Sequence, residues 1–197
     1  MRDPLPLATI HDAILEFLRH RTDAVLFGAQ AVNAYVDEPR MTQDVDVLSS
    51  SAAQLADLIR EHLAKTFHIA VRVRAVADGN GYRVFQLREP KNRHLAEVRQ
   101  LDVFPPTNLI NDIRVPTPEE LIAQKVITLT RRRNQPKSGT DWRDVAMLLR
   151  VFPQLKEDGG AVHTRLTAAS ADAATMATWR EFVKIDLADE ADEDAGF

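Results

Sequence analysis

The sequence predicts an α/β fold, of the α+β kind, in which helices flank a mixed β-sheet. Three kinds of pattern predict it: short apolar runs typical of buried strands, amphipathic stretches with helical spacing, and neighbouring strands separated by turn residues. Three strands follow one another without an intervening helix, so we expect them to pair antiparallel. The expected strands are residues 24–27, 44–48, 69–77, 82–88 and 94–104, with turns at 78–81 and 90–93.

Amphipathic stretches predict helices around these strands. The clearest one begins at Thr117, which can cap it, and has Pro118 in its first turn and Glu119 and Glu120 at its N-terminal end. The other expected helices are residues 7–20, 29–36, 52–65, 140–149 and 171–185. We therefore expect a core at residues 1–112, a helical part at 113–185, and a disordered acidic tail at 186–197.

The composition excludes several classes of protein. The chain of 197 residues is 45% hydrophobic and 27% charged, as in water-soluble globular proteins, and no stretch is apolar enough to span a bilayer. The absence of cysteine excludes disulfides and thiolate metal sites, and the six scattered histidines lack zinc-ligand spacing. A net charge of -4 argues against nucleic-acid binding by the whole surface. We expect a cytoplasmic protein without membrane contact.

The stretch from residue 25 to residue 48 carries the chemistry. Gly28 ends the first strand, where a residue without a Cβ allows a sharp turn or a close approach. On the second strand Asp44 and Asp46 share one face, because side chains alternate along a strand. Two carboxylates on a half-buried face repel each other unless a cation lies between them. Oxygen ligands favour Mg²⁺ or Mn²⁺, so the sequence predicts a site for one of these ions.

This arrangement resembles the minimal nucleotidyltransferase fold related to DNA polymerase β, and most closely the AbiEii type of nucleotidyltransferase toxin. The resemblance covers roughly residues 24–150, and its motif is Arg40, Thr42, Asp44 and Asp46. The chain departs from the family at Gly28-Ala29, where the usual pair is Gly-Gly or Gly-Ser. The lost serine hydroxyl removes one possible phosphate contact.

The resemblance implies transfer of a nucleotidyl group from an NTP to an acceptor hydroxyl on RNA, tRNA or a protein. It also implies a toxin with a cognate antitoxin protein. The expected metal-binding and catalytic residues are Asp44, Asp46 and Asp102. The expected nucleotide-binding residues are Gly28, Ala29, Arg40, Thr42, Lys125, Asp141 and Asp144. The basic residues expected to contact RNA are Arg131, Arg132, Arg133 and Lys137.

Several of these residues also have an ordinary structural interpretation. Asp102 could cap the following Pro-Pro turn, and the long stem of Lys125 could pass the edge of the core to reach solvent. Asp141 and Asp144 could stabilise the N-terminal end of their helix, by its dipole and by pairing with Arg143 or Lys137. The run of arginines at residues 131–133 could complement the dipole of the preceding helix.

Two other functions are compatible with the sequence. One is a catalytically silent protein of the same fold that acts as a binding partner or antitoxin, which the Gly28-Ala29 departure and the inserted residues between Lys137 and Asp141 would suit. The other is a glycosyltransferase that uses D-x-D to hold a metal and a sugar nucleotide. Such folds usually need a longer chain, and a D-x-D soon after a glycine turn favours the nucleotidyltransferase.

Overall fold

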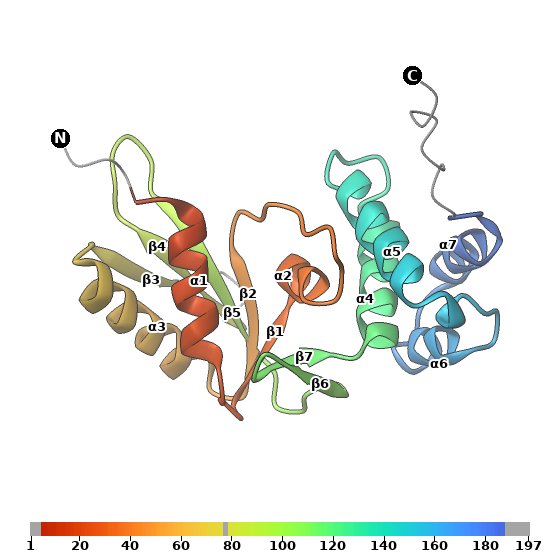
Figure 1. The fold of residues 1–197 in the computed structure, drawn as a ribbon, viewed down its shortest axis with the longest axis horizontal. Coiled ribbons are helices and arrows are strands. Elements are labelled where there is room, and N and C mark those ends of the chain that lie inside the picture. Colours follow the sequence, from red (N-terminus) through yellow and green to blue (C-terminus); the bar gives the residue numbers. More distant parts are fainter. Residues whose placement is uncertain (1–4, 77–78, 188–197) are drawn as a thin grey trace, which may run out of the picture. The chain divides into compact units, whose positions relative to one another are not determined.

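The computed structural model describes residues 5–76 and 79–187, and the chain divides into two compact units, residues 1–117 and 118–197. The first unit contains a five-stranded sheet and a separate β-hairpin, whereas the described part of the second is helical (Figure 1). The predicted α/β class with a mixed sheet and a helical C-terminal part is confirmed. Within the described residues, no helix is long and apolar enough to cross a membrane.

The five-stranded sheet has the order β1-β2-β5-β4-β3. Strand β2 is antiparallel to β1 and parallel to β5, while β5, β4 and β3 pair antiparallel, so the sheet is mixed as expected. The strands are β1 Ala24–Phe27, β2 Val45–Ser49, β3 Val71–Ala75, β4 Gly81–Gln86 and β5 Arg93–Gln100. The predicted 78–81 turn is described only from Gly79, because residues 77–78 lie outside the described part of the chain.

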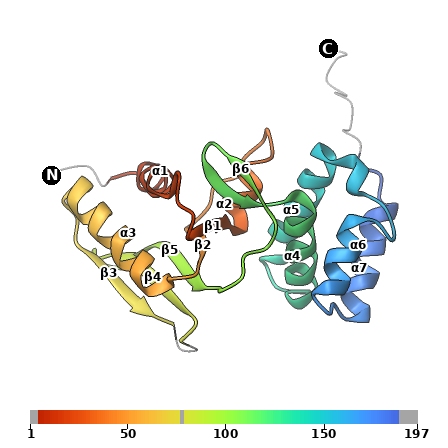
Figure 2. The same cartoon turned by 90° about the horizontal axis from the view of Figure 1, so that it is seen from below.

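Helices α1 Leu7–Leu18 and α3 Ala52–Phe67 pack together on one side of this sheet (Figure 2). Their apolar stripes meet the strand residues that alternate toward them. Leu55, Ile59 and Leu63 of α3, with Val84 and Val98 of the sheet, are almost completely buried. The short helix α2 Gly28–Asn33 follows β1 directly. The opposite side of the sheet carries the polar residues discussed below.

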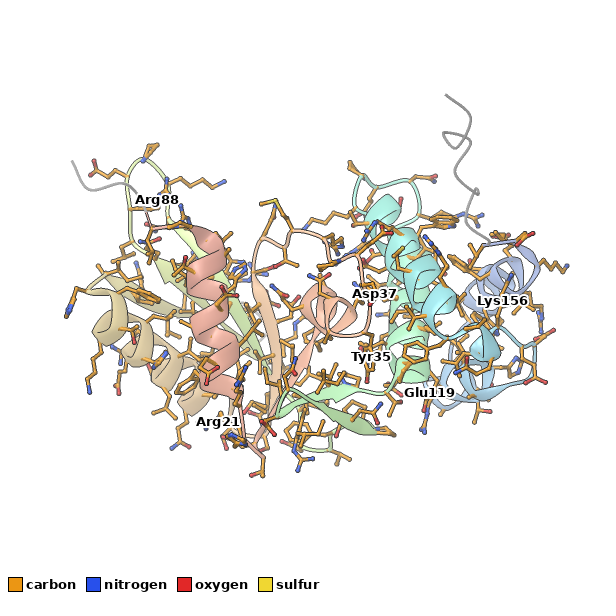
Figure 3. All side chains as sticks on the ribbon, viewed as in Figure 1. Arg21, Tyr35, Asp37, Arg88, Glu119 and Lys156 are labelled. Carbon is orange, nitrogen blue, oxygen red and sulfur yellow. The ribbon has the colours of Figure 1, made fainter. Side chains whose placement is uncertain are left out.

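A second hairpin, β6 Thr107–Ile110 and β7 Ile113–Pro116, closes the first unit. The sequence interpretation missed it, although Asn111 and Asp112 at its turn adopt the positive φ that such two-residue turns require. The hydroxyl of Tyr35, labelled in Figure 3, donates to the Pro116 carbonyl at 2.8 Å and accepts from Asn108 at 3.1 Å. These bonds tie the chain after α2 to the hairpin.

The second unit is built from α4 Pro118–Arg131, α5 Ser138–Val151, the 3-10 turn η1 Pro153–Leu155, α6 Ala161–Ala168 and α7 Ala173–Lys184. Its core includes Ile122 and Val126 of α4, Leu148 of α5 and Trp179 of α7, all fully buried. Helix α6 was not anticipated, because residues 161–168 show only a weak apolar periodicity. Most of the tail predicted at 186–197 lies outside the described residues.

Candidate active site

Gly28 lies directly against the second aspartate of the D-x-D pair. Phe27 of β1 is in register with Asp46 of β2, and Gly28 follows with φ +69. A Cβ built on Gly28 would be 2.3 Å from Asp46 Oδ2, which is far inside van der Waals contact. The position therefore requires glycine both for its backbone conformation and for the space that the Asp46 carboxylate occupies.

Glu97 lies beside Asp46 on the neighbouring strand. The two residues are in register on the parallel strands β2 and β5, so their side chains share one face of the sheet. Glu97 is only 6% exposed. Its carboxylate accepts hydrogen bonds from Nε of Arg83 and Nε of Arg99, both at 2.7 Å. Two carboxylates from adjacent strands therefore lie on the same face of the sheet, and Asp46 is the one next to Gly28.

The two arginines keep Glu97 ionised. Burial raises the pKa of the Glu97 carboxyl, but the hydrogen bonds and charges of Arg83 and Arg99 outweigh it, and the pKa lies below its ordinary value. The same hydrogen bond and charge raise the pKa of Arg83, with further contributions from Asp44 and Asp46. Arg83 is thus electrostatically coupled to all three carboxylates.

Asp44 precedes β2 and is held by a histidine. His94 Nδ1 lies 2.8 Å from Asp44 Oδ2, so Nδ1 carries the hydrogen that the carboxylate accepts. The His94 ring packs against Phe85 at 5.1 Å between centroids. Its Nε2 is buried and has no hydrogen-bond partner among the described residues. This side chain is therefore fixed on one side by packing and on the other by Asp44.

Asp102 is not brought to Asp44 and Asp46. It follows the end of β5 and accepts a 2.8 Å hydrogen bond from Gln100 Nε2, which also donates to the Ser50 carbonyl. Gln100 pairs with Ser49 at the far end of β2, so Asp102 lies at the opposite end of the strand from Asp44. The acid that is in register with Asp46 is instead Glu97, the one acid inside the apolar stretch 95–98.

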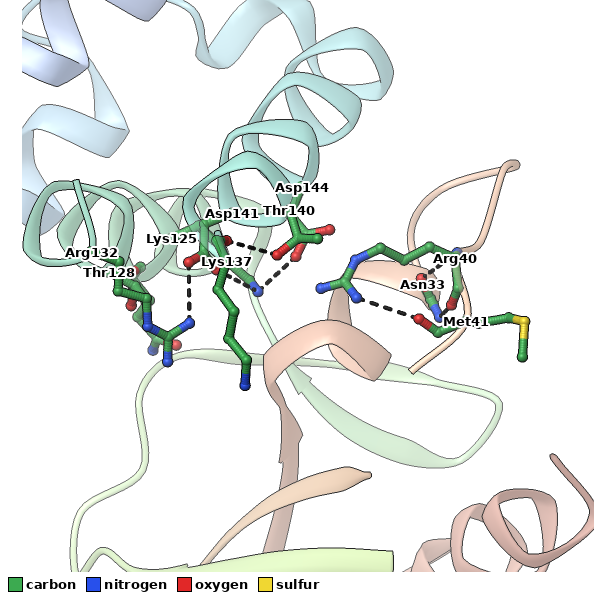
Figure 4. A network of polar contacts seen from close by, with 11 residues as sticks. Asn33, Arg40, Met41, Lys125, Thr128, Arg132, Lys137, Thr140, Asp141 and Asp144 are labelled. Atoms are coloured by element: carbon green, nitrogen blue, oxygen red, sulfur yellow. Dashed lines mark hydrogen bonds and ion pairs between the residues drawn. The ribbon is translucent and has the colours of Figure 1, made fainter. Parts of the chain in front are cut away.

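Arg40 and Thr42 lie in the loop before β2, which side chains of α2 hold in place. Asn33 binds the backbone of Arg40 twice, donating to its carbonyl at 2.8 Å and accepting from its amide at 3.1 Å (Figure 4). Gln30 donates to the Thr42 hydroxyl at 2.8 Å, and His11 Nδ1 of α1 lies 3.5 Å from the same oxygen. Burial lowers the pKa of His11 despite the opposing charge of Asp44. Thr42 thus links α2 and α1 to the loop.

In the helical unit, Lys125 of α4 lies between two buried acids of α5 (Figure 4). Its ammonium is 2.7 Å from Asp144 Oδ2 and 3.6 Å from Asp141 Oδ1. Arg132 is 3.1 Å from the other oxygen of Asp141. Asp144 is 0% and Asp141 is 3% exposed, and Lys125 itself is 9% exposed. The four charges balance, so Lys125 does not simply extend past the core into solvent.

The other predicted basic residues are exposed. Arg131, Arg133 and Lys137 all lie on the surface of the helical unit. Arg133 lines a cavity of about 160 Å³ between α4, α5 and α7, whose walls include Trp142 and Phe182. None of the residues predicted to bind the nucleotide lines this cavity. Arg132 differs from Arg131 and Arg133 because its guanidinium forms an ion pair with Asp141.

The fold is that of nucleotidyltransferases. The structure is similar to Megavirus polyadenylate synthase, with TM-score 0.61 and 13% identity over 77% of this chain, which spans 32% of that protein. It is also similar to JHP933 from Helicobacter pylori, with TM-score 0.54 and 18% identity over 89% of this chain and 87% of the other. A third similar structure is the antibiotic-resistance factor ANT(2'')-Ia, with TM-score 0.52 and 12% identity over 83% of this chain and 89% of the other.

The chain belongs to the family described as nucleotidyl transferase AbiEii toxin of type IV toxin–antitoxin systems, whose model matches residues 12–195. No curated protein matches the sequence. The family assignment confirms the resemblance on which the sequence interpretation was built, and with it the class of enzyme. The family match extends beyond the motif around Asp44 and includes the helices that carry Lys125 and Asp144.

Proposed function

We propose that the protein transfers a nucleotidyl group from an NTP to an acceptor hydroxyl, at a metal site formed by Asp44, Asp46 and Glu97. The observation that supports this proposal is the register of β2 and β5, in which Asp46 is paired with Glu97, while Asp46 itself lies against Gly28. Asp44 precedes Asp46 by two residues and is oriented by His94. Glu97 thereby takes the place that the sequence interpretation gave to Asp102.

The three carboxylates have the ligand chemistry of Mg²⁺ or Mn²⁺, although the described residues contain no group of three or more acids or histidines already arranged to hold a metal ion. Such ions prefer carboxylate oxygens, and the site contains no thiolate and only one imidazole in direct contact with an acid. When bound, the metal would stabilise charge on the attacking and leaving oxygens at the α-phosphate. To bind it, Glu97 would exchange part of its contact with Arg83 and Arg99 for the ion, while those arginines remain near the phosphates.

The transfer needs little acid–base chemistry from the protein. The acceptor oxygen forms a bond to the α-phosphorus, the bond to the bridging oxygen breaks, and pyrophosphate leaves. Asp46 accepts the proton of the acceptor hydroxyl, and Arg40 neutralises charge on the phosphates. Gly28 and Ala29 begin the helix α2 directly after β1, and the missing Cβ of Gly28 leaves the space that the Asp46 carboxylate occupies. Lys125 contributes to phosphate binding only if its ammonium leaves Asp144, and Asp141 and Asp144 then act through Lys125.

The family and the basic residues support a cellular RNA as the acceptor. Membership of a toxin family supports a cellular target and a cognate antitoxin. RNA or tRNA is the acceptor that exposed arginines would suit, and Arg131, Arg133 and Lys137 offer one such surface.

The experiment is incubation of the full chain with labelled NTPs, Mg²⁺ and total RNA. Asp44→Ala with Asp46→Ala should abolish labelled product and Mg²⁺-dependent NTP binding while the protein stays folded. If the double variant is unfolded and the native protein shows no Mg²⁺-dependent NTP binding, the role of these acids is structural.

The His94 imidazole should act on metal binding by orienting Asp44. His94→Ala should weaken Mn²⁺ binding by about 10- to 100-fold, as is typical for partners of metal ligands. His94→Asn keeps an N–H donor close to the position of Nδ1 and should retain most of the affinity. His94→Gln places its donor closer to the position of Nε2 and should not. Mn²⁺ titration followed by electron paramagnetic resonance measures this, and equal affinities for the Asn and Gln variants would contradict it.

A further inference from the structure

A row of charged residues crosses the sheet on the side away from α1 and α3. Arg74 of β3 is in register with Arg83 of β4, Arg83 with Glu97 of β5, and Glu97 with Asp46 of β2. Residues in register on adjacent strands share a face of the sheet. The row therefore runs without a break from the candidate metal site to the edge strand, over three strand spacings or about 14 Å.

A second row lies beside the first, and it too has an arginine at its β3 end and an aspartate at its other end. Arg72 of β3 is in register with Phe85 of β4, Phe85 with His94 of β5, and His94 is bonded to Asp44. Each aspartate of the D-x-D pair is thus connected, across the sheet, to an arginine on β3. Phe85 is half-buried between the two ends of its row.

The arginines on β3 are not neutralised within the described part of the chain. Arg83 and Arg99 are paired with Glu97, but Arg72 and Arg74 are exposed and form no ion pair with any described residue. Arg74 also lies in register with Arg83, and like charges in direct register destabilise a sheet. Charges on an edge strand do discourage pairing with other chains, yet that role does not require alignment with the catalytic carboxylates.

We infer that this face, formed by Arg72, Arg74 and Arg83, is the docking surface for the acceptor, and that the acceptor is a single-stranded polynucleotide. The inference rests on the proposed transfer reaction and adds where the acceptor lies. Phosphates contact the arginines, and the terminal hydroxyl of the strand reaches Asp46 at the other end of the row. Phe85 offers a ring on which a base can stack beside Arg72. A neutral small acceptor would gain nothing from three aligned arginines.

The test uses the full chain and a labelled single-stranded RNA, with binding measured by fluorescence anisotropy at several KCl concentrations. Arg72→Gln with Arg74→Gln should weaken binding at least tenfold. It should also reduce the slope of log affinity against log salt by about 1.4, because each phosphate contact on a single strand contributes about 0.7. Arg60→Gln with Lys65→Gln on α3 removes the same charge from the covered side of the sheet and should change the slope little.

Two controls separate this inference from the proposed reaction. Mg²⁺-dependent NTP binding should be unchanged in the Arg72 and Arg74 variant, and its absence from the native protein would overturn the reaction itself. Intact NTP binding with an unchanged RNA salt slope would overturn the docking surface alone. The docking surface would also be wrong if RNA affinity fell only in Arg131→Gln with Arg133→Gln, because RNA would then bind the helical unit. Transfer to a protein hydroxyl but not to RNA would also overturn it.

Discussion

Replacing Lys125 by alanine is expected to lower the free energy of unfolding by about 3–5 kcal/mol. The substitution leaves Asp144, which is fully buried, without the ammonium 2.7 Å away, and leaves Asp141 with Arg132 alone. A buried carboxylate that loses its nearest opposite charge is costly, because less of its desolvation is then offset. Urea unfolding of the native and variant chains measures the effect. Arg131→Ala, an exposed change at the end of the same helix, should stay within about 0.5 kcal/mol.

A double substitution distinguishes two roles of Lys125: an ion pair with Asp144 that only stabilises the fold, and an ammonium that binds the phosphates of the NTP. Lys125→Met with Asp144→Leu removes both charges from the buried pair, and it should recover most of the stability that Lys125→Ala loses. If the ammonium only joins α4 to α5, this variant should also recover NTP binding. If the ammonium contacts phosphates, NTP binding stays weak although the fold is restored. A Lys125→Ala protein with native stability would show that the salt bridge contributes nothing.

The parts of the fold that the sequence predicted depend on short-range patterns. The apolar run of β1, the turn at Gly28, the alternation of Asp44 and Asp46, and the capped start of α4 can all be read within a few residues. The α6 helix and the β6–β7 hairpin were missed because residues 107–116 and 161–168 are short and weakly patterned. Their stability comes from tertiary packing, for example through the bond from Tyr35 to Pro116.

The parts of the site that were not predicted depend on strand register. Asp102 and Glu97 are only five residues apart in sequence, and both belong to the expected strand 94–104. Only the parallel pairing of β2 with β5 determines which of them meets Asp46. The same applies to Lys125, whose partners on α5 are 16 and 19 residues further along the chain. Local periodicity assigns each residue to a face of its strand or helix, but it does not say which distant element that face meets.

Glu97→Gln is expected to reduce the rate of nucleotidyl transfer about 10³-fold or more, whereas Asp102→Asn should leave it within a few-fold of the native rate. Glu97 is in register with Asp46, so in the proposed site its loss removes one of the three anionic ligands for the metal at the reacting phosphate. A metal at such a site supplies several kcal/mol of transition-state stabilisation, and each 1.36 kcal/mol changes a rate tenfold. Asp102 accepts a hydrogen bond from Gln100 at the far end of the strand.

The two variants are well matched, because each replaces one carboxylate by its amide. Glutamine at residue 97 still accepts from one arginine through its carbonyl, but its amide group faces the other, so some loss of stability accompanies the loss of rate. Mn²⁺ affinity separates the two effects: it should fall in a folded Glu97→Gln protein and stay native in Asp102→Asn. The measurements are single-turnover transfer of a labelled NTP, Mn²⁺ titration, and thermal unfolding of both variants. The opposite result would be native metal affinity and rate in Glu97→Gln and the loss of both in Asp102→Asn. It would show that Asp102, not Glu97, is the third metal-binding carboxylate, and that the end of β5 rearranges.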